Sequence, residues 1–146
     1  CRGIPRRSSW LSNPVPEVLR STAKSFYEEY RDKLQTFEDT REVAPGVIVR
    51  HTGGHTPGHS VVDLVSGGDR LTFAGDAVFP VGFDHPDWQN GFEHDPEEAA
   101  RVRMRLFQEL AQTGGLLVAA HLPFPSLGHV AVDGEAFRWV PIIWDY

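Results

Sequence analysis

Histidine and aspartate residues follow three predicted strands of this 146-residue chain at the points where those strands end. His55 comes shortly after a β-branched run, Asp76 follows Leu71–Ala74, and His121 follows Leu116–Ala120. Functional groups of α/β proteins tend to lie on loops at strand ends, where a rigid sheet positions them. Imidazole and carboxylate are also the ligands that zinc accepts where no thiolate is available. The three residues therefore form a candidate metal site.

Small residues stand beside each of these three side chains and allow the backbone to approach closely. They are Gly53-Gly54, Gly75 and Ala119-Ala120. Taken singly, each candidate also has an ordinary structural explanation, because an aspartate at a strand end often caps a turn and a lone histidine is often a hydrogen-bonded structural residue. The joint pattern, rather than any one residue, favours a site.

Three segments of the chain together resemble the metal motifs of the metallo-β-lactamase superfamily. Residues 54–60, Gly-His-Thr-Pro-Gly-His-Ser, resemble the third motif, residues 74–76 the fourth, and residues 120–121 the fifth, and the candidate ligands are 21 and 45 positions apart. The stretch His-Leu-Pro-Phe-Pro from His121, followed by Phe-Arg-Trp-Val-Pro at residues 137–141, is similar to the methyl parathion hydrolase branch. The resemblance extends over about residues 17–143.

This resemblance implies a role for each matching residue. His55 would complete a three-histidine metal site, Asp76 would bridge two zinc ions, and His121 would bind the second ion. Other divalent metals remain open alternatives to zinc. His59 is not a ligand in the family's pattern, so we expect it to form hydrogen bonds that stiffen the loop behind the ligands.

The family's first two metal motifs, which together read His-x-His-x-Asp-His, are absent from the sequence, since no two of the seven histidines have His-x-His spacing. We therefore expect residues 1–146 to be the C-terminal part of one domain, the α/β (α+β) half of a four-layer αβ/βα sandwich, with an irregular lead-in at residues 1–16. Only part of the ligand set is present, so we expect this chain alone to be inactive.

For the parent protein, the resemblance implies a dinuclear metallo-hydrolase that cleaves esters, lactones or phosphotriesters with a metal-bridging hydroxide, and Asp76 is its predicted catalytic residue. Phe79 and Phe124 are predicted to form an apolar wall for the substrate, although both could instead be core residues. The alternative function is a non-catalytic remnant or binding module that lacks a complete metal site. The sequence upstream of Cys1 would discriminate the hydrolase from the remnant, because an in-frame His-x-His-x-Asp-His motif supports the hydrolase.

Charge and composition narrow the range of partners. The net charge is −6, and residues 42–146 hold six basic and fourteen acidic residues, which argues against binding to nucleic acid. We interpret Arg101, Arg103 and Arg105 as part of a solvated helix face. No stretch is long and apolar enough for a membrane helix, and a single cysteine excludes a disulfide framework. We expect a small-molecule substrate and a cytoplasmic location, with periplasm, secretion and a homodimer left open.

Hydrophobic periodicity and turn residues predict the elements that would position the candidate site. A helix is expected over residues 17–37, and a second helix should begin at Asp95-Pro96 and end before Gly114. A hairpin turn is expected at residues 67–69, and residues 77–94 should form a loop. The predicted strands cover residues 47–49, 61–65, 71–74, 116–120, 129–132 and 137–143.

Overall fold

The computed structural model describes residues 17–143, so the predicted lead-in at residues 1–16 lies outside the described residues. The chain divides into two compact units, residues 1–36 and 37–146. In the first unit, α1 spans Glu17–Tyr30. The prediction of a helix to Phe37 is wrong, because the amides of Lys33 and Leu34 both donate to the Tyr30 carbonyl and close a turn there. Isolated helices of this length are marginal without packing, so periodicity alone cannot extend them.

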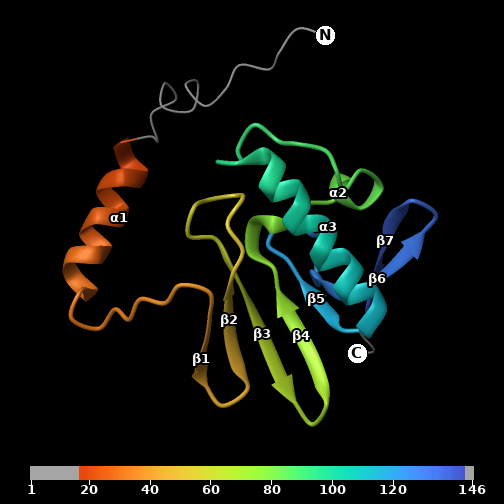
Figure 1. Cartoon of the computed structure of the whole chain (residues 1–146), viewed down its shortest axis with the longest axis horizontal. Coiled ribbons are helices and arrows are strands. Elements are labelled where there is room, and N and C mark those ends of the chain that lie inside the picture. Colours follow the sequence, from red (N-terminus) through yellow and green to blue (C-terminus); the bar gives the residue numbers. More distant parts are fainter. Residues whose placement is uncertain (1–16, 144–146) are drawn as a thin grey trace, which may run out of the picture. The chain divides into compact units, whose positions relative to one another are not determined.

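The second unit is built on a seven-stranded sheet whose strands lie in chain order (Figure 1). All neighbouring strands pair antiparallel except β4 and β5, which are parallel. The strands are β1 (Thr40–Ala44), β2 (Val47–His51), β3 (Ser60–Ser66), β4 (Asp69–Phe73), β5 (Leu116–Val118), β6 (Leu127–Asp133) and β7 (Ala136–Pro141). The mixed α+β class predicted from the sequence is confirmed.

The hairpin between β3 and β4 forms where the sequence predicts it. Gly67 and Gly68 have φ angles of 60° and 93°, and a two-residue turn of this kind needs positive φ at both central positions. β1, in contrast, was not predicted, because its sequence Thr-Arg-Glu-Val-Ala is polar and mostly exposed. Its pairing with β2 makes it a strand, and Glu42 accepts a hydrogen bond from the Gly46 amide at the turn.

The long helix α3 (Pro96–Thr113) begins and ends as predicted. The Asp95 carboxylate accepts a hydrogen bond from the Glu98 amide at 3.0 Å, and Pro96 occupies the first helical position. Gly114 ends the helix in the left-handed conformation, with φ of 69°. The short helix η2 (Gly75–Ala77) ends where the segment predicted as a loop begins, and the short helix α2 (Val81–Asp84) lies within it. None of the helices in residues 17–143 has the length and apolarity needed to cross a bilayer.

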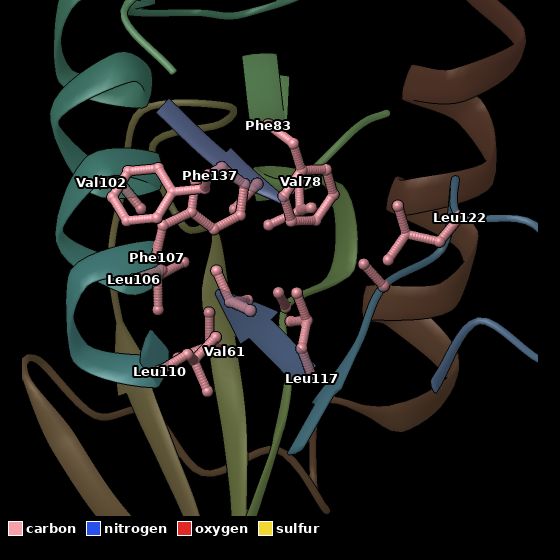
Figure 2. Close-up of a cluster of buried hydrophobic side chains, with 14 residues drawn as sticks. Val61, Val78, Phe83, Val102, Leu106, Phe107, Leu110, Leu117, Leu122 and Phe137 are labelled. Carbon is pink, nitrogen blue, oxygen red and sulfur yellow. The ribbon is translucent and has the colours of Figure 1, made fainter. Parts of the chain in front are cut away.

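The hydrophobic core lies between α3 and one face of the sheet (Figure 2). Leu106, Phe107 and Leu110 of α3 are 3% exposed or less and pack in one cluster with Val61 of β3 and Leu117 of β5. Burying each such side chain contributes about 1.5–3 kcal/mol. This core packs α3 against β3, β5 and Ala74, the residue after β4, next to the loops of the candidate site.

The opposite face of the same strands is apolar but not buried. We call it the open face; cross-strand pairing places on it Val47, Val49, Val62, Leu64, Leu71, Phe73, Leu116 and Val118. Leu64 and Phe73 are 44% and 43% exposed. Side chains alternate between the two faces of a strand, so Val61 and Asp63 of β3 are buried while Leu64 is not. Within residues 37–143, helices therefore cover only one face of the sheet.

Candidate metal centre

Three strands that run in the same direction carry the predicted ligands to one edge of the sheet. β2 and β4 are both antiparallel to β3, and β5 is parallel to β4, so the carboxyl ends of all three strands meet at that edge. His55 follows β2, Asp76 lies in η2 directly after β4, and His121 follows β5. The strand predicted to reach Ala120 ends at Val118, so His121 lies on a turn beyond it.

The carboxylate of Asp76 lies between the two histidine rings. Its Oδ2 is 3.6 Å from His55 Nε2, and its Oδ1 is 2.8 Å from His121 Nε2. Each oxygen of the carboxylate thus faces a different imidazole. The structure brings all three predicted ligands together, although they are far apart in the sequence.

The donor set can be compared with what zinc requires. Two ligand atoms about 2.1 Å from a tetrahedral ion are about 3.4 Å apart, and the 3.6 Å between His55 and Asp76 is close to that separation. The 2.8 Å between His121 and Asp76 is instead typical of a direct hydrogen bond. The buried Nδ1 atom of His55 has no hydrogen-bond partner, so nothing in the described part of the chain fixes its tautomer.

The donor chemistry fits zinc, but the number of donors does not complete a site. Within residues 17–143, no group of three or more histidine, cysteine, aspartate or glutamate side chains is arranged to hold one metal ion. A catalytic zinc site normally has three protein ligands on one ion. These residues therefore fit part of a metal centre.

The loop that carries His55 is closed by its own hydrogen bonds. The carbonyl of His59 accepts hydrogen bonds from the amides of Thr52 and Gly53. The Nδ1 atom of the His59 ring lies 2.7 Å from the Thr52 hydroxyl. His51 Nε2 lies 2.7 Å from the Pro57 carbonyl. Burial lowers the pKa of His59, and the nearby rings of His55 and His51 lower it further, against an opposing effect of Asp76. His59 thus forms hydrogen bonds within the loop, as expected, and its role toward a metal stays a prediction.

The same loop is attached to the start of α3. The amide of His94 donates to the His55 carbonyl, and the amide of Asp95 donates to the Gly54 carbonyl, both at 2.9 Å. Gly54 has φ of 77°, and a Cβ there would lie 2.6 Å from the Ala99 Cα atom of the helix. Only glycine allows this contact. The position of His55 is therefore fixed by α3 as well as by the sheet.

Backbone hydrogen bonds also join the Asp76 turn to the His121 turn. The amide of Ala74 donates to the Val118 carbonyl at 2.8 Å, and the amide of Ala120 donates to the Gly75 carbonyl at 3.3 Å. These bonds extend the parallel pairing of β4 and β5 beyond the ends of the strands. They explain why Asp76 and His121 approach each other closely.

The two phenylalanines predicted to contact substrate lie outside the buried core cluster. Phe124 is 84% exposed on the turn after His121. Phe79 is half-buried, and the guanidinium carbon of Arg103 lies 4.1 Å from the centre of its ring. The alternative that both are core residues is therefore not what the structure shows, and their contact with a substrate stays a prediction. A separate hollow of about 300 Å³ between Pro80, Leu122 and Trp139 contains none of the three predicted ligands.

Arg103 is a residue of this region whose surroundings the sequence did not reveal. The sequence predicts a solvated helix face for Arg101, Arg103 and Arg105, and for Arg103 this prediction is wrong. Its side chain is fully buried, 2.6 Å from the equally buried Glu93 carboxylate. Burial lowers the pKa of Arg103, and Glu93 opposes that shift. The only available signal was its position on the helix: Arg103 follows the buried Val102, on the side of the apolar residues Leu106 and Phe107.

Comparison with known proteins identifies the family of this fold. A family model described as the metallo-beta-lactamase superfamily matches residues 4–134. No protein of the curated set gives a match. Among solved structures, the chain is similar to AidC, a dizinc quorum-quenching lactonase in complex with a homoserine product, with 26% identity, 90% of this chain and 46% of that chain covered, and a TM-score of 0.79.

Two further structures support the same assignment. AbOPH, a hydrolase in the beta lactamase superfamily, shares 32% identity over 86% of this chain and 45% of its own, with a TM-score of 0.73. A probable metal-dependent hydrolase from Staphylococcus aureus shares 25% identity over 80% of this chain and 43% of its own, with a TM-score of 0.64. The chain spans less than half the length of these three structures. By its sequence and by its fold, the chain belongs to the metallo-β-lactamase superfamily.

Proposed function

We propose that this chain is the C-terminal portion of a dinuclear zinc hydrolase that acts on small-molecule esters, lactones or phosphotriesters. The observation that carries the proposal is the position of Asp76, whose two carboxylate oxygens face His55 and His121 separately. A carboxylate with one oxygen toward each of two histidines can serve two ions at once. The remaining ligands would come from a His-x-His-x-Asp-His segment upstream of this chain.

The similar structures support this class of chemistry. AidC is a dizinc lactonase, and the S. aureus protein is a probable metal-dependent hydrolase. Two zinc ions would supply a water molecule of lowered pKa and a Lewis acid for a developing oxyanion. The substrate class stays at three kinds of ester bond, because Phe79 and Phe124 provide apolar surface and no group that distinguishes among them.

The residues of this chain would hold and orient this centre. His55 and His121 each present Nε2 toward Asp76, which sets the distance between the two halves of the site. Asp76 is partly exposed, at 44%, so a small substrate can approach it within the described unit. Phe124 lies on the turn next to His121 and would supply an apolar contact for the substrate.

A non-catalytic binding module is the second candidate. It is favoured by the observation that no complete group of metal ligands exists within residues 17–143. The two proposals differ in one expectation: a hydrolase needs the upstream ligands, whereas a binding module does not. The cytoplasmic location and the homodimer remain predictions.

The experiment compares residues 1–146 alone with the same chain joined to its upstream segment. Two protein ligands per ion bind zinc weakly, so we expect the bare chain to show no zinc-dependent hydrolysis of an aryl ester, a lactone or a phosphotriester above a buffer-plus-zinc control. The longer protein should bind two zinc ions, measured by competition with a chelator, and hydrolyse at least one of these substrates.

Single substitutions in the longer protein identify the ligands. His55→Ala, Asp76→Ala and His121→Ala should each abolish turnover and reduce zinc content, whereas His129→Ala, an exposed histidine on β6 that contacts the Gly114 carbonyl, should change neither. Chelator-sensitive turnover by the bare chain would contradict the proposal. Zinc-independent binding of a ligand by a longer protein without turnover would favour the binding module.

A further inference from the structure

We propose that Arg103 is a positioning residue of the candidate metal centre, which holds His55 and Asp76 at their separation through the segment between them. The expected effect on zinc binding rests on the proposed function, whereas the contacts of Arg103 do not depend on it. Arg103 itself touches none of the predicted ligands. Its contacts all lie along residues 77–93, which run from the Asp76 turn to the start of α3.

The guanidinium of Arg103 binds this segment at four points. Its Nε donates to the Ala77 carbonyl at 3.3 Å, and one terminal nitrogen donates to the Pro86 and Trp88 carbonyls at 3.0 and 2.8 Å. The other terminal nitrogen donates to Glu93 at 2.6 Å. Four of the five donors that arginine carries are therefore used on one segment of chain.

Each end of that segment is attached to one half of the candidate metal centre. At its start, Ala77 is the residue after Asp76, and its amide donates to the Ala74 carbonyl. At its end, the amides of His94 and Asp95 donate to the carbonyls of His55 and Gly54. Arg103 is thus bonded near both ends, to the carbonyl of Ala77 and to Glu93. We therefore expect a different side chain at position 103 to shift the Asp76 turn relative to the His55 loop.

The residues around Arg103 match an arginine and no shorter cation. The ring of Phe79 lies 4.1 Å from the guanidinium carbon, and a Cβ at Gly82 would come within 2.8 Å of Arg103 Cδ. The second oxygen of Glu93 accepts a hydrogen bond from the Asn90 amide, which fixes the carboxylate opposite the guanidinium. A lysine offers a single point charge and cannot reach the carbonyls of Ala77, Pro86 and Trp88 at the same time.

The experiment uses the protein with its upstream segment and the variants Arg103→Lys and Arg103→Met. The matched control is Arg105→Met, which removes an arginine two residues away on the same helix, where it forms an exposed ion pair with Glu98. Zinc affinity is measured by chelator competition on the folded fraction. Hydrogen exchange is measured, without metal, at the amides of Ala77, His94 and Asp95.

We expect Arg103→Lys to bind zinc about 10–100-fold more weakly, the usual effect of removing a group that supports metal ligands. Exchange at the three amides should be about tenfold faster or more, while the amides of β3 and β4 keep their wild-type protection. Arg105→Met should match the wild type in both measurements. If Arg103→Met does not fold, Arg103→Lys and Glu93→Gln provide the test.

Two results would overturn the proposal. One is wild-type exchange at the three amides in a folded Arg103→Lys protein, which would show that the segment does not depend on the guanidinium. The other is accelerated exchange with unchanged zinc affinity, which would reduce Arg103 to a purely structural residue. If the wild type itself binds no zinc through His55, the proposed function fails, while the exchange data still decide whether Arg103 holds the segment.

Discussion

At the scale of single residues, the type of a side chain predicts candidate ligands, whereas the surrounding chain determines whether a side chain is buried. His55, Asp76 and His121 could be selected from the sequence because imidazole and carboxylate at strand ends are rare enough to stand out together. Arg103 could not, because Arg101 and Arg105 have the same spacing and are exposed. Its burial depends on a segment of chain that folds over it, and residue type carries no information about that segment.

Asp63 gives the first prediction, which concerns stability in acid. Its side chain is 3% exposed, and burial alone would raise its pKa; hydrogen bonds from Arg50, Thr72 and Arg70 outweigh burial and lower the pKa below the ordinary value of 3.8. The unfolded chain therefore binds a proton at a higher pH than the folded protein does. The stabilisation by Asp63 is complete above about pH 4 and is lost as the pH falls through the lowered pKa.

The measurement is the free energy of unfolding of the protein joined to its upstream segment, between pH 7 and pH 2 in urea. Asp63→Asn should cost about 1–3 kcal/mol at pH 7, because Arg50 and Arg70 lose the buried carboxylate and keep the partly exposed Glu109 as a partner, and it should flatten the acid side of the profile. Asp133→Asn, which removes an exposed carboxylate 3.9 Å from Arg138, should change stability by less than about 1 kcal/mol. Equal acid profiles for Asp63→Asn and the wild type would contradict the assignment.

At the scale of elements, local signals predicted some structures and long-range pairing determined others. α3 was predictable because Asp95, Pro96 and Gly114 mark its ends chemically. β1 was not, because a polar strand becomes a strand only by pairing with β2. The helix predicted over residues 17–37 ends at Tyr30, since periodicity does not report whether a helix has anything to pack against.

The contact between the His55 loop and α3 gives the second prediction, which belongs to the scale of elements. Gly53 and Gly54 both have positive φ, 70° and 77°, so alanine at either position costs about 1–2 kcal/mol in backbone strain. Only at Gly54 would the new Cβ also meet the helix, 2.6 Å from Ala99 Cα; at Gly53 nothing lies within 4 Å. Gly54→Ala must therefore move the loop away from α3, whereas Gly53→Ala need not.

Zinc affinity and unfolding of the two variants separate these effects in the protein with its upstream segment. Both should lose about 1–2 kcal/mol or more of stability. Gly54→Ala alone should also weaken zinc binding by about tenfold or more, because the loop places His55. Equal zinc affinity for Gly53→Ala and Gly54→Ala would show that the packing of the loop on α3 does not position the ligand.

At the scale of the whole molecule, the sheet unit within residues 37–143 has helices on one face only. The helices of residues 37–143 cover the face of the sheet that holds Val61 and Leu117, and the open face defined above consists of apolar side chains that are at least partly exposed. Monomeric proteins rarely expose a contiguous apolar surface of this kind. The predicted half of a four-layer sandwich would have such a face, because a second sheet packs there.

The open face therefore gives the last prediction, in which the same substitution acts in opposite directions in two proteins. Residues 1–146 alone should aggregate or bind a hydrophobic dye such as ANS and should unfold without a sharp transition. The double variant Leu64→Thr with Phe73→Thr removes the two most exposed side chains of that face and should reduce dye binding and aggregation of the bare chain.

In the protein joined to its upstream segment, the same double variant should be destabilised by several kcal/mol, because these side chains would then be buried against the second sheet. Val132→Thr serves as the control in both proteins, since Val132 is 65% exposed on β6 and lies outside the open face. Circular dichroism melting and light scattering provide the readouts. A soluble, monomeric bare chain with one sharp melting transition would contradict the half-domain interpretation, because an apolar face that needs no cover is not half of a sandwich core.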